Sequence, residues 1–318
     1  MVESPQEGVA TASEGRTSLL SIFLIFLRLG FTSFGGPIAH IAYFRDEFVG
    51  RRNWIEERAY ADLVALCQFL PGPASSQVGI GVGLARGGLL GAFVAWIGFT
   101  MPSAFALIAF GYGVVAYQDV VNSGVLHGLK VVAVAVVAQA VWGMARNLCP
   151  DAKRATLAVL AACAVLAAPT PLAQISVIVI GGFAGFVFLR AETPREHVPL
   201  GINVNRRLAV ASLLLFFLGL IGLPILATVY PSHTLALIES FYSSGSLVFG
   251  GGHVVLPLLQ TEVVPSGWVS NDAFLAGYGA AQAVPGPLFT FAAYLGAVLE
   301  PVPNGLTGGL ICLAAIFV

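Results

Sequence analysis

The stretch Gln68-Phe69-Leu70-Pro71-Gly72-Pro73 returns 214 positions later as Gln282-Ala283-Val284-Pro285-Gly286-Pro287, and each copy lies between apolar runs. Pro-Gly-Pro cannot continue a helix, because proline lacks the amide donor and its ring clashes with the preceding turn. A new helix can begin at the second proline, since the first turn does not need that donor. Each copy therefore predicts a broken helix.

The repeat extends in the N-terminal direction from both copies. Phe34-Gly35-Gly36 returns as Phe249-Gly250-Gly251, Glu47 returns as Glu262, and Trp54 returns as Trp268. A shared order of several motifs predicts two related halves. We expect the first repeat at 18–207, and a linking span with the start of a second repeat at 208–318. Because the chain reaches Val318 inside an apolar run, this second repeat is expected to be truncated at its C-terminus.

The composition places the chain in a membrane. Hydrophobic residues make up 57% and charged residues only 10%, with 37 glycines and a mean hydropathy of +0.88. Such values are typical of an all-α polytopic membrane protein and exclude a nucleic-acid-binding domain. Residues 1–17 are polar, and we expect a disordered tail there. The four cysteines have neither zinc nor redox spacing, so neither a metal nor a cofactor is expected.

The apolar runs fall into two length classes. Short runs occur in pairs and do not reach the ~20 residues of a straight span, which predicts re-entrant or broken helices. The expected short pairs are 19–31 with 38–49, 55–69 with 74–86, 234–249 with 253–263, and 271–283 with 288–299. The expected full spans are 88–117, 124–146, 154–168, 171–189 and 207–230, and a last run begins near Gly305. Because five spans is an odd number, the two repeats should have opposite orientations.

The distribution of basic residues favours the same inverted-topology repeat. All fifteen Lys and Arg residues lie between Arg16 and Arg207. Short loops rich in Lys and Arg stay cytoplasmic, and twelve of the fifteen do so if both early pairs enter from the cytoplasm. The corresponding loops of the second half, 264–272 and 300–305, contain neither residue. The prediction is a multi-pass protein of the cytoplasmic (inner) membrane with a cytoplasmic N-terminus.

Broken helices at membrane depth point to an anion site. Irregular backbone there is tolerated only against protein or a wet cavity, and helix N-termini favour anions. One helix end contributes at most ~2 kcal/mol, whereas dehydrating an ion costs of order 20 kcal/mol on a Born estimate, so several donors must converge. The candidate anion-binding residues are Gly35, Gly36, Pro37, His40, Gln68, Pro71, Gly72, Pro73, Ser75, Ser76, Gln77, Gly250, Gly251, Gly252, His253, Gln282, Pro285, Gly286, Pro287 and Thr290.

Purely structural interpretations of these residues stay open at this point. The Pro-Gly-Pro motifs also fit simple kinks in packed helices, although Gln68 and Gln282 would then be buried polar groups without a purpose. His40 also fits a role as a cap or as a partner of a neighbouring carbonyl. Arg45, Asp62 and Glu262 are candidates for coupling to an ion. Arg45 fits a solvated interfacial cluster equally well, and Asp62 fits an ion pair with a nearby arginine.

The ordered motifs resemble the chromate ion transporter family. The resemblance rests on Phe34-Gly35-Gly36-Pro37 with His40, on Cys67-Gln68 through Pro71-Gly72-Pro73 with Gln77, and on their later counterparts, and it covers residues 30 to 310 or so. It implies fused, oppositely oriented halves that export chromate, a tetrahedral dianion similar to sulfate, and so confer chromate resistance. Gly252 departs from the pattern because the first half has Pro37 at that place.

The resulting prediction is a secondary transporter that exports a small tetrahedral oxyanion, chromate first, by alternating access. Sulfate or another inorganic anion is the alternative substrate, and a channel is the alternative mechanism. An intramembrane enzyme built on His40 and Asp62 is the remote alternative, but the five histidines are dispersed and no nucleophile–base spacing supports it. The expected partners are the substrate anion and the lipid bilayer, and a homodimer is left open.

Overall fold

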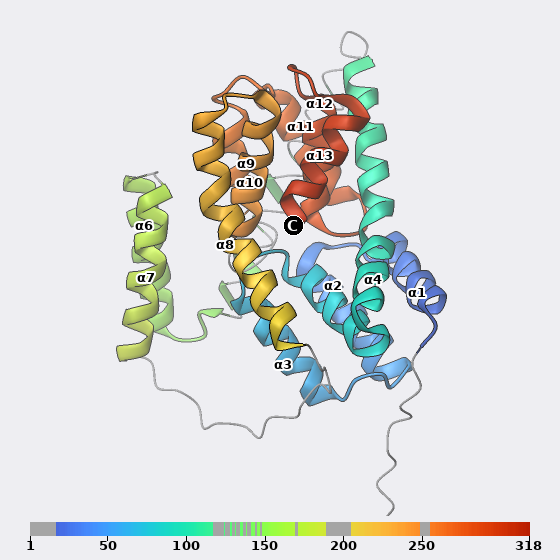
Figure 1. Ribbon diagram of the computed structural model, residues 1–318. Coiled ribbons are helices and arrows are strands. Elements are labelled where there is room, and N and C mark those ends of the chain that lie inside the picture. Colours follow the sequence, from blue (N-terminus) through green and yellow to red (C-terminus); the bar gives the residue numbers. More distant parts are fainter. Residues whose placement is uncertain are drawn as a thin grey trace, which may run out of the picture. The chain divides into compact units, whose positions relative to one another are not determined.

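The computed structural model describes residues 17–116, 149–168, 171–188, 205–248 and 255–318, and scattered positions between 124 and 148. The chain divides into two compact units, residues 1–133 with 197–318 and residues 134–196. Every regular element among the described residues is a helix (Figure 1). The prediction of an all-α protein is confirmed. The predicted tail 1–17 and the predicted span 124–146 lie largely outside the described residues.

The first short pair is broken at the predicted glycines. Helix α1 (Leu19–Thr32) begins after Ser18, whose hydroxyl accepts a hydrogen bond from the Ser21 amide at 3.2 Å. Helix α2 (Gly36–Arg45) follows and continues into the π-helical turn η1 (Asp46–Arg51). Gly35 and Gly36 have φ of 97° and 75°, a left-handed region that favours glycine. The chain can therefore change direction there before Pro37 begins the new helix.

The second short pair is followed by a sharp reversal. Helix α3 (Glu57–Phe69) ends before Pro-Gly-Pro, and helix α4 (Ala74–Ala116) starts after it. Gly88 has φ 64° and ψ −155°, and it divides α4 into two arms. A Cβ on Gly83 would lie 2.5 Å from the carbonyl oxygen of Gly91, so the arms lie side by side with their backbones in contact. The predicted boundary between 74–86 and 88–117 is confirmed.

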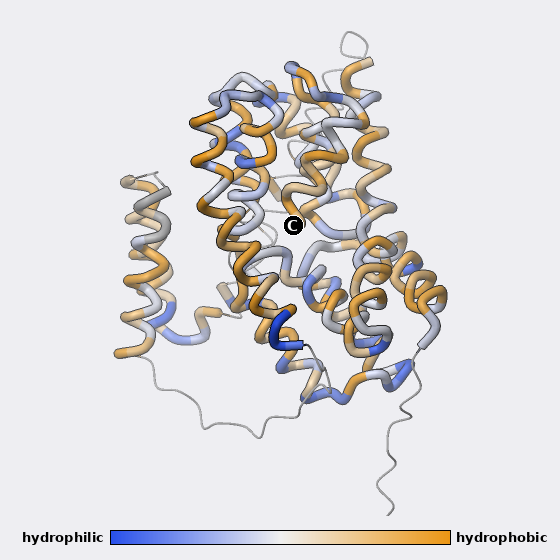
Figure 2. The backbone as a smooth tube through the Cα atoms, in the orientation of Figure 1, coloured by the Kyte–Doolittle hydropathy of each residue, from blue (hydrophilic) through white to orange (hydrophobic). Residues whose placement is uncertain are grey.

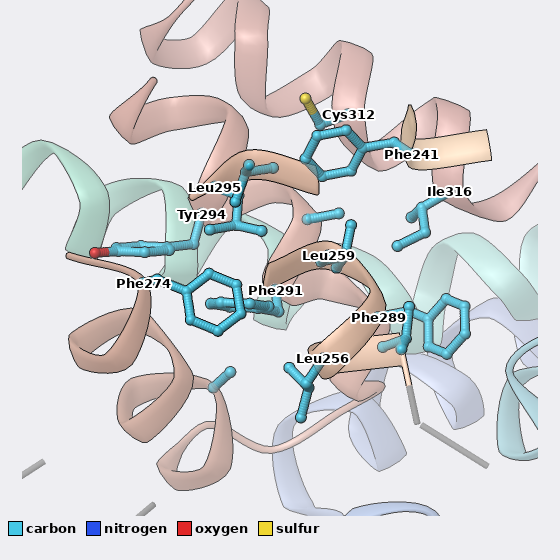
Figure 3. Close-up of a cluster of buried hydrophobic side chains, with 14 of the residues drawn as sticks. Phe241, Leu256, Leu259, Phe274, Phe289, Phe291, Tyr294, Leu295, Cys312 and Ile316 are labelled. Carbon is cyan, nitrogen blue, oxygen red and sulfur yellow. The ribbon is translucent and has the colours of Figure 1, made fainter. Parts of the chain in front are cut away.

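The later part of the same unit repeats the pattern of short helices. It contains α9 (His233–Ser246), α10 (Val255–Val263), α11 (Asn271–Ala283), η2 (Leu288–Thr290), α12 (Phe291–Val298) and α13 (Gly305–Phe317). None of them reaches the ~20 residues of a straight span. Their core is aromatic, with Phe274 and Phe291 edge to face at 5.1 Å (Figure 3). These helices surround a compact core despite their shortness.

Within this unit the two sets of short helices lie at opposite levels. In Figure 1, α2 and α3 lie in the lower part, and α9 to α12 lie in the upper part. The second arm of α4 joins the two levels, because Gly111 packs against Ala297 and Val298 of α12. A Cβ on Gly111 would lie 3.1 Å from the Cβ of Ala297. The second arm of α4 therefore connects the lower and the upper set of short helices.

Helix α8 (Arg206–Val229) has the properties of a lipid-facing span. By length and composition, α4 and α8 are the two described helices that are apolar and long enough to cross a membrane. No residue of α8 is buried, and Figure 2 shows it apolar along its length with a hydrophilic start. Exposing so large an apolar surface to water is unfavourable, whereas lipid tails solvate it. The membrane interpretation of the composition agrees with this helix.

The unit at 134–196 contains α6 (Ala152–Ala167) and α7 (Pro171–Phe188), which correspond to two predicted spans. The carboxylate of Asp151 caps α6 by accepting a hydrogen bond from the Arg154 amide at 2.9 Å. Helices α6 and α7 contact each other. They form a helical hairpin.

Candidate functional site

The two Pro-Gly-Pro loops each form a hydrogen bond to a segment that is distant in the sequence. The Gly72 amide donates to the carbonyl oxygen of Val248 at 2.7 Å, and the Gly286 amide donates to that of Ser33 at 3.0 Å. Ser33 precedes Phe34-Gly35-Gly36, and Val248 precedes Phe249-Gly250-Gly251. Each loop therefore bonds to the residue before the Phe-Gly-Gly motif of the opposite half.

The loops themselves need glycine. Gly72 and Gly286 have φ of 113° and 110°, where side-chain-bearing residues are strained. A Cβ on Gly72 would lie 2.7 Å from Gln77 Nε2, and a Cβ on Gly286 would lie 2.7 Å from Ser103 Oγ. Gln77 Nε2 in turn donates to the Pro71 carbonyl oxygen at 2.7 Å. Both loops are therefore tightly packed at their tips.

His40 connects three helices beside these loops. Its side chain is fully buried, with Nε2 3.2 Å from the Ser33 carbonyl oxygen and Nδ1 3.3 Å from Ser75 Oγ. A carbonyl oxygen only accepts hydrogen bonds, so we assign the ring proton to Nε2, and Nδ1 accepts from the Ser75 hydroxyl. The Phe99 ring packs against the imidazole edge to face at 5.2 Å. His40 thus joins α1, α2 and both arms of α4.

Several buried polar atoms around the loops have no hydrogen-bond partner within the described part of the chain. They are Ser33 Oγ, Ser76 Oγ, Gln77 Oε1, Thr100 Oγ1 and Gln282 Nε2. An unsatisfied buried donor or acceptor costs about 1–3 kcal/mol. Helix α4 also begins here at Ala74, and the amides of a first helical turn have no partner within the helix. A polar ligand with several acceptor oxygens would satisfy such a set.

The sequence comparisons identify the family. The sequence pattern of the family described as chromate transporter matches residues 20–186 and 235–318. The chain belongs to the chromate transporter family. It is 28% identical over 305 residues to a probable chromate transport protein of Synechococcus elongatus, covering 94% of this chain and 72% of the relative. It is 25% identical over 294 residues to a chromate transport protein of Pseudomonas aeruginosa, covering 87% and 66%. No solved structure matches the chain.

We call the two Pro-Gly-Pro loops, with their hydrogen bonds to Val248 and Ser33, the crossing. In this member of the chromate transporter family, most of the predicted first-half residues lie in or next to it. Ser75, Ser76 and Pro37 are buried, Pro71 and Pro73 are half-buried, and Gly35 is exposed at the start of α2. The expectation that Gln68 is buried was wrong, because its side chain is exposed at the end of α3. Gln68 directly follows the buried Cys67, so its side chain lies about 100° around α3 from the buried face.

The predicted second-half residues are described only in part. Gly250, Gly251, Gly252 and His253 lie outside the described residues. Gln282 and Pro285 are half-buried, and Pro287 is buried. Thr290 is buried, and its hydroxyl donates to the Pro287 carbonyl oxygen at 2.7 Å. Thr290 therefore closes its own loop.

Sequence reasoning missed Ser33, Thr100 and Ser103. Ser33 supplies the carbonyl that holds the second Pro-Gly-Pro loop, and Ser103 Oγ donates to the Thr100 carbonyl oxygen at 3.0 Å. A signal for the last two was present, because both hydroxyls flank Pro102 inside an apolar span. Ser33 had a weaker signal, since it directly precedes the Phe-Gly-Gly motif.

The three coupling candidates lie in different surroundings. Arg45 Nε lies 2.6 Å from Glu57 Oε1, and both side chains are more than half exposed, which agrees with a solvated cluster. Such exposed pairs contribute little to stability. Glu262 is exposed and accepts a hydrogen bond from Ser240 at 3.2 Å, and Asp62 is half-exposed on α3. Arg45 and Glu262 make these contacts away from the Pro-Gly-Pro crossing.

A charged cluster stabilises the loop after α2. Glu47 is 8% exposed and bonds to Arg51 at 3.2 Å and to Arg52 at 2.7 Å. Arg52 also lies over the Trp54 ring, 5.5 Å from its centre. Burial raises the pKa of Glu47, but the hydrogen bonds and charges of Arg52 and Arg51 outweigh it, and the net pKa is below the ordinary value.

Replacing Glu47 by glutamine is expected to remove a pH-dependent part of the stability. A carboxyl with a lowered pKa stabilises the folded state above its unfolded pKa of about 4.3, and this stabilisation disappears as the pH falls through the lower folded value. Thermal unfolding in detergent should show Glu47→Gln about 1 kcal/mol less stable near neutral pH and equal to the wild type in acid. Glu57→Gln, in the exposed pair, is the control and should change little. A constant difference at every pH would contradict this account.

Proposed function

We propose that the chain is a secondary transporter of small tetrahedral oxyanions, with chromate as the first substrate, exporting them across the cytoplasmic membrane by alternating access. The reciprocal bonding of the two Pro-Gly-Pro loops carries the proposal, because it brings the breaks of both halves to one place. Membership in the chromate transporter family supports ion transport with chromate as substrate. The transporter names of the relatives also point away from an enzyme.

The anion site, in this proposal, lies at the start of α4 beside the crossing. The first-turn amides and the hydroxyl of Ser76 would donate to the anion, and Ser33 Oγ and Thr100 Oγ1 supply further donors nearby. A tetrahedral dianion offers four oxygen acceptors and so can satisfy several donors at once. Several donors are required, because one helix end contributes at most ~2 kcal/mol against dehydration.

The proposal predicts concentrative transport by the purified chain in lipid vesicles. We expect labelled chromate to accumulate against its gradient when a driving gradient is imposed, and unlabelled sulfate to compete if the site reads only the tetrahedral shape. Ser76→Ala, which removes one donor, should lower the initial rate about 3- to 10-fold, equivalent to about 0.5–1.5 kcal/mol. Ser266→Ala, in an exposed loop, is the control.

Two results of this experiment would count against the proposal. Equilibration of the anion without accumulation under any imposed gradient would favour the channel alternative. Accumulation of sulfate without any transport of chromate would show that sulfate, the alternative, is the substrate.

We further propose that residues 18–207 form a first repeat and that residues 208–318 contain a linking span and the start of a second repeat of opposite orientation. The support comes from matching loop geometry as well as from the crossing: the Trp54 amide donates to the Phe48 carbonyl at 2.7 Å, and the Trp268 amide donates to the Val263 carbonyl at 3.1 Å. Repeats of this kind, with broken helices meeting at the midplane, are a common plan of secondary transporters.

Opposite orientation predicts that the two tryptophan loops lie on opposite sides of the membrane. In a chain with its four cysteines replaced by alanine, Glu56→Cys should react with a membrane-impermeant maleimide only from the cytoplasmic side, and Ser266→Cys only from the other side. Both positions are exposed. Labelling of both from one side would overturn the inverted repeat.

A further inference from the structure

His40 shares a hydrogen-bond acceptor with the second Pro-Gly-Pro loop. The Ser33 carbonyl oxygen accepts from His40 Nε2 at 3.2 Å and from the Gly286 amide at 3.0 Å. The other ring nitrogen, Nδ1, bonds to Ser75, in the first turn of α4. The imidazole therefore touches both the helix start that would face the anion and the carbonyl that holds the opposite half.

We propose that His40 is the proton-coupling residue of the transporter, binding a proton on Nδ1 when the anion binds and releasing it when the anion leaves. This inference rests on the proposed function. In the neutral ring, Nδ1 accepts from the Ser75 hydroxyl, so that hydroxyl cannot serve the anion. When Nδ1 takes a proton from the aqueous side, it donates to Ser75 Oγ, and the Ser75 hydrogen becomes free to donate to the oxyanion.

Protonation of His40 reverses the hydrogen bond between Nδ1 and the Ser75 hydroxyl, and this reversal links proton binding to anion binding. Each cycle takes one proton from the solution on one side and returns it on the other, with no bond to the anion formed or broken. The imidazolium also places one positive charge beside a dianion, where an opposite charge is most effective because water is excluded. Bound anion and bound proton therefore stabilise each other, which is the requirement for moving both across the membrane in the same direction.

None of the hydrogen bonds and ring contacts described for His40 involves a charged side chain of the elements around it. At the far end of α2, Arg45 bonds to Glu57, and in η1 Glu47 bonds to Arg51 and Arg52. Arg28, Tyr43, Asp46 and Arg58 are exposed, and Asp62 and Arg86 are half-exposed. The Tyr60 hydroxyl donates to the Ile41 carbonyl at 2.6 Å, the Tyr112 hydroxyl at the far end of α4 accepts from the Leu306 amide at 2.8 Å, and Cys67 is buried. Facing His40 directly are Ser33, Ser75 and the Phe99 ring, which are uncharged.

The described residues at the corresponding later positions cannot bind a proton. By the offsets of the repeat, Val255 corresponds to His40 and Phe289 corresponds to Ser75, and both are buried in the apolar core. At these two positions the proposed proton-binding contact is therefore not repeated.

The test compares proton movement with anion movement in vesicles that contain the purified chain and a trapped pH indicator. In the wild type, chromate added on one side should move protons, and the rate of chromate transport should depend on pH, because the imidazole changes its protonation state in each cycle. His40→Gln keeps an amide donor near the Nε2 position for Ser33 but cannot bind the proton. We expect its chromate flux to fall at least about tenfold, with the remaining flux independent of pH and free of proton movement.

His233→Gln is the matched control. His233 is a half-buried histidine at the start of α9, and its ring packs on Trp268, away from the crossing. It should keep the pH profile and the proton movement of the wild type. Ser75→Ala gives an independent test, because without the hydroxyl the number of protons moved per chromate should fall. It decides the question if His40→Gln is not recovered as a folded protein.

The possible outcomes distinguish failure of the proton-coupling role of His40 from failure of the proposed transport function. Proton movement that persists in His40→Gln, or an unaltered proton-to-chromate ratio in Ser75→Ala, overturns the inference. Wild-type chromate transport without proton movement overturns it too, but leaves the proposed function intact. A wild-type protein that moves no oxyanion under any gradient overturns the proposed function, and the inference with it.

Discussion

Replacing Gly286 by alanine is expected to lower oxyanion transport at least about tenfold. The backbone at Gly286 has φ 110°, where a Cβ is strained by about 1–3 kcal/mol, and that Cβ would lie 2.7 Å from Ser103 Oγ. The loop can relieve both problems only by moving, which breaks the bond from the Gly286 amide to the Ser33 carbonyl. Since about 1.4 kcal/mol corresponds to a factor of ten, loss of this contact alone accounts for the expected decrease. Initial rates of chromate uptake in vesicles measure it.

Two further glycine variants make the experiment specific. At Gly72, which also has a left-handed φ of 113°, the new Cβ meets the flexible end of Gln77, so Gly72→Ala should lose less activity than Gly286→Ala. Gly113 lies in α4, and nothing lies within 4 Å of the position where its Cβ would be, so Gly113→Ala should transport like the wild type. Equal rates for Gly286→Ala and Gly113→Ala would show that the crossing contact is dispensable.

The broken helices could be predicted from the sequence because helix breaks are determined by the local residues, here proline and glycine. Proline and glycine in Pro71-Gly72-Pro73 and its second copy restrict the backbone wherever they occur, so the helix ends at Phe69 and Ala283 agree with the predictions to the residue. The boundary near Gly88 was predicted from the lengths of the apolar runs, and the left-handed backbone at Gly88 was not. Helix ends that are set by proline and glycine are therefore the features of such a fold that can best be predicted from sequence.

The contacts between the halves were not predictable in the same way. Ser33 takes part through its carbonyl oxygen, which every residue has, and the sequence does not say which carbonyl a loop about 250 residues away will meet. The same limit applies to Gln68, which was predicted to be a buried polar residue and is exposed. Its helix face, and not its repeat position, determines its exposure. The candidate site was therefore predicted as a set of segments, and its connections came from the fold.

Replacing Gly296 by valine is expected to prevent stable folding of the second half. Gly296 of α12 faces the backbone of α13, where a Cβ would overlap the carbonyl of Gly308 and lie 2.8 Å from the Cα of Gly309. Gly308 has the same relation to the carbonyl of Gly296, so neither helix can move aside without losing the contact on the other. Small residues at such crossings are what allows helices to pack closely in a membrane.

The expected loss for Gly296→Val is about 3 kcal/mol or more, at the upper end for overpacked sites, because backbone atoms cannot rotate away as a side chain does. Thermal unfolding and size-exclusion behaviour in detergent measure it. Gly222→Val is the matched control, since Gly222 lies in the apolar helix α8 and its nearest neighbour is Leu218 of the same helix, 3.8 Å from the added Cβ. If Gly296→Val unfolds at the same temperature as Gly222→Val, α12 and α13 do not cross at these glycines. In that case the rigid packing on which the second Pro-Gly-Pro loop depends has to be sought between α12 and α4.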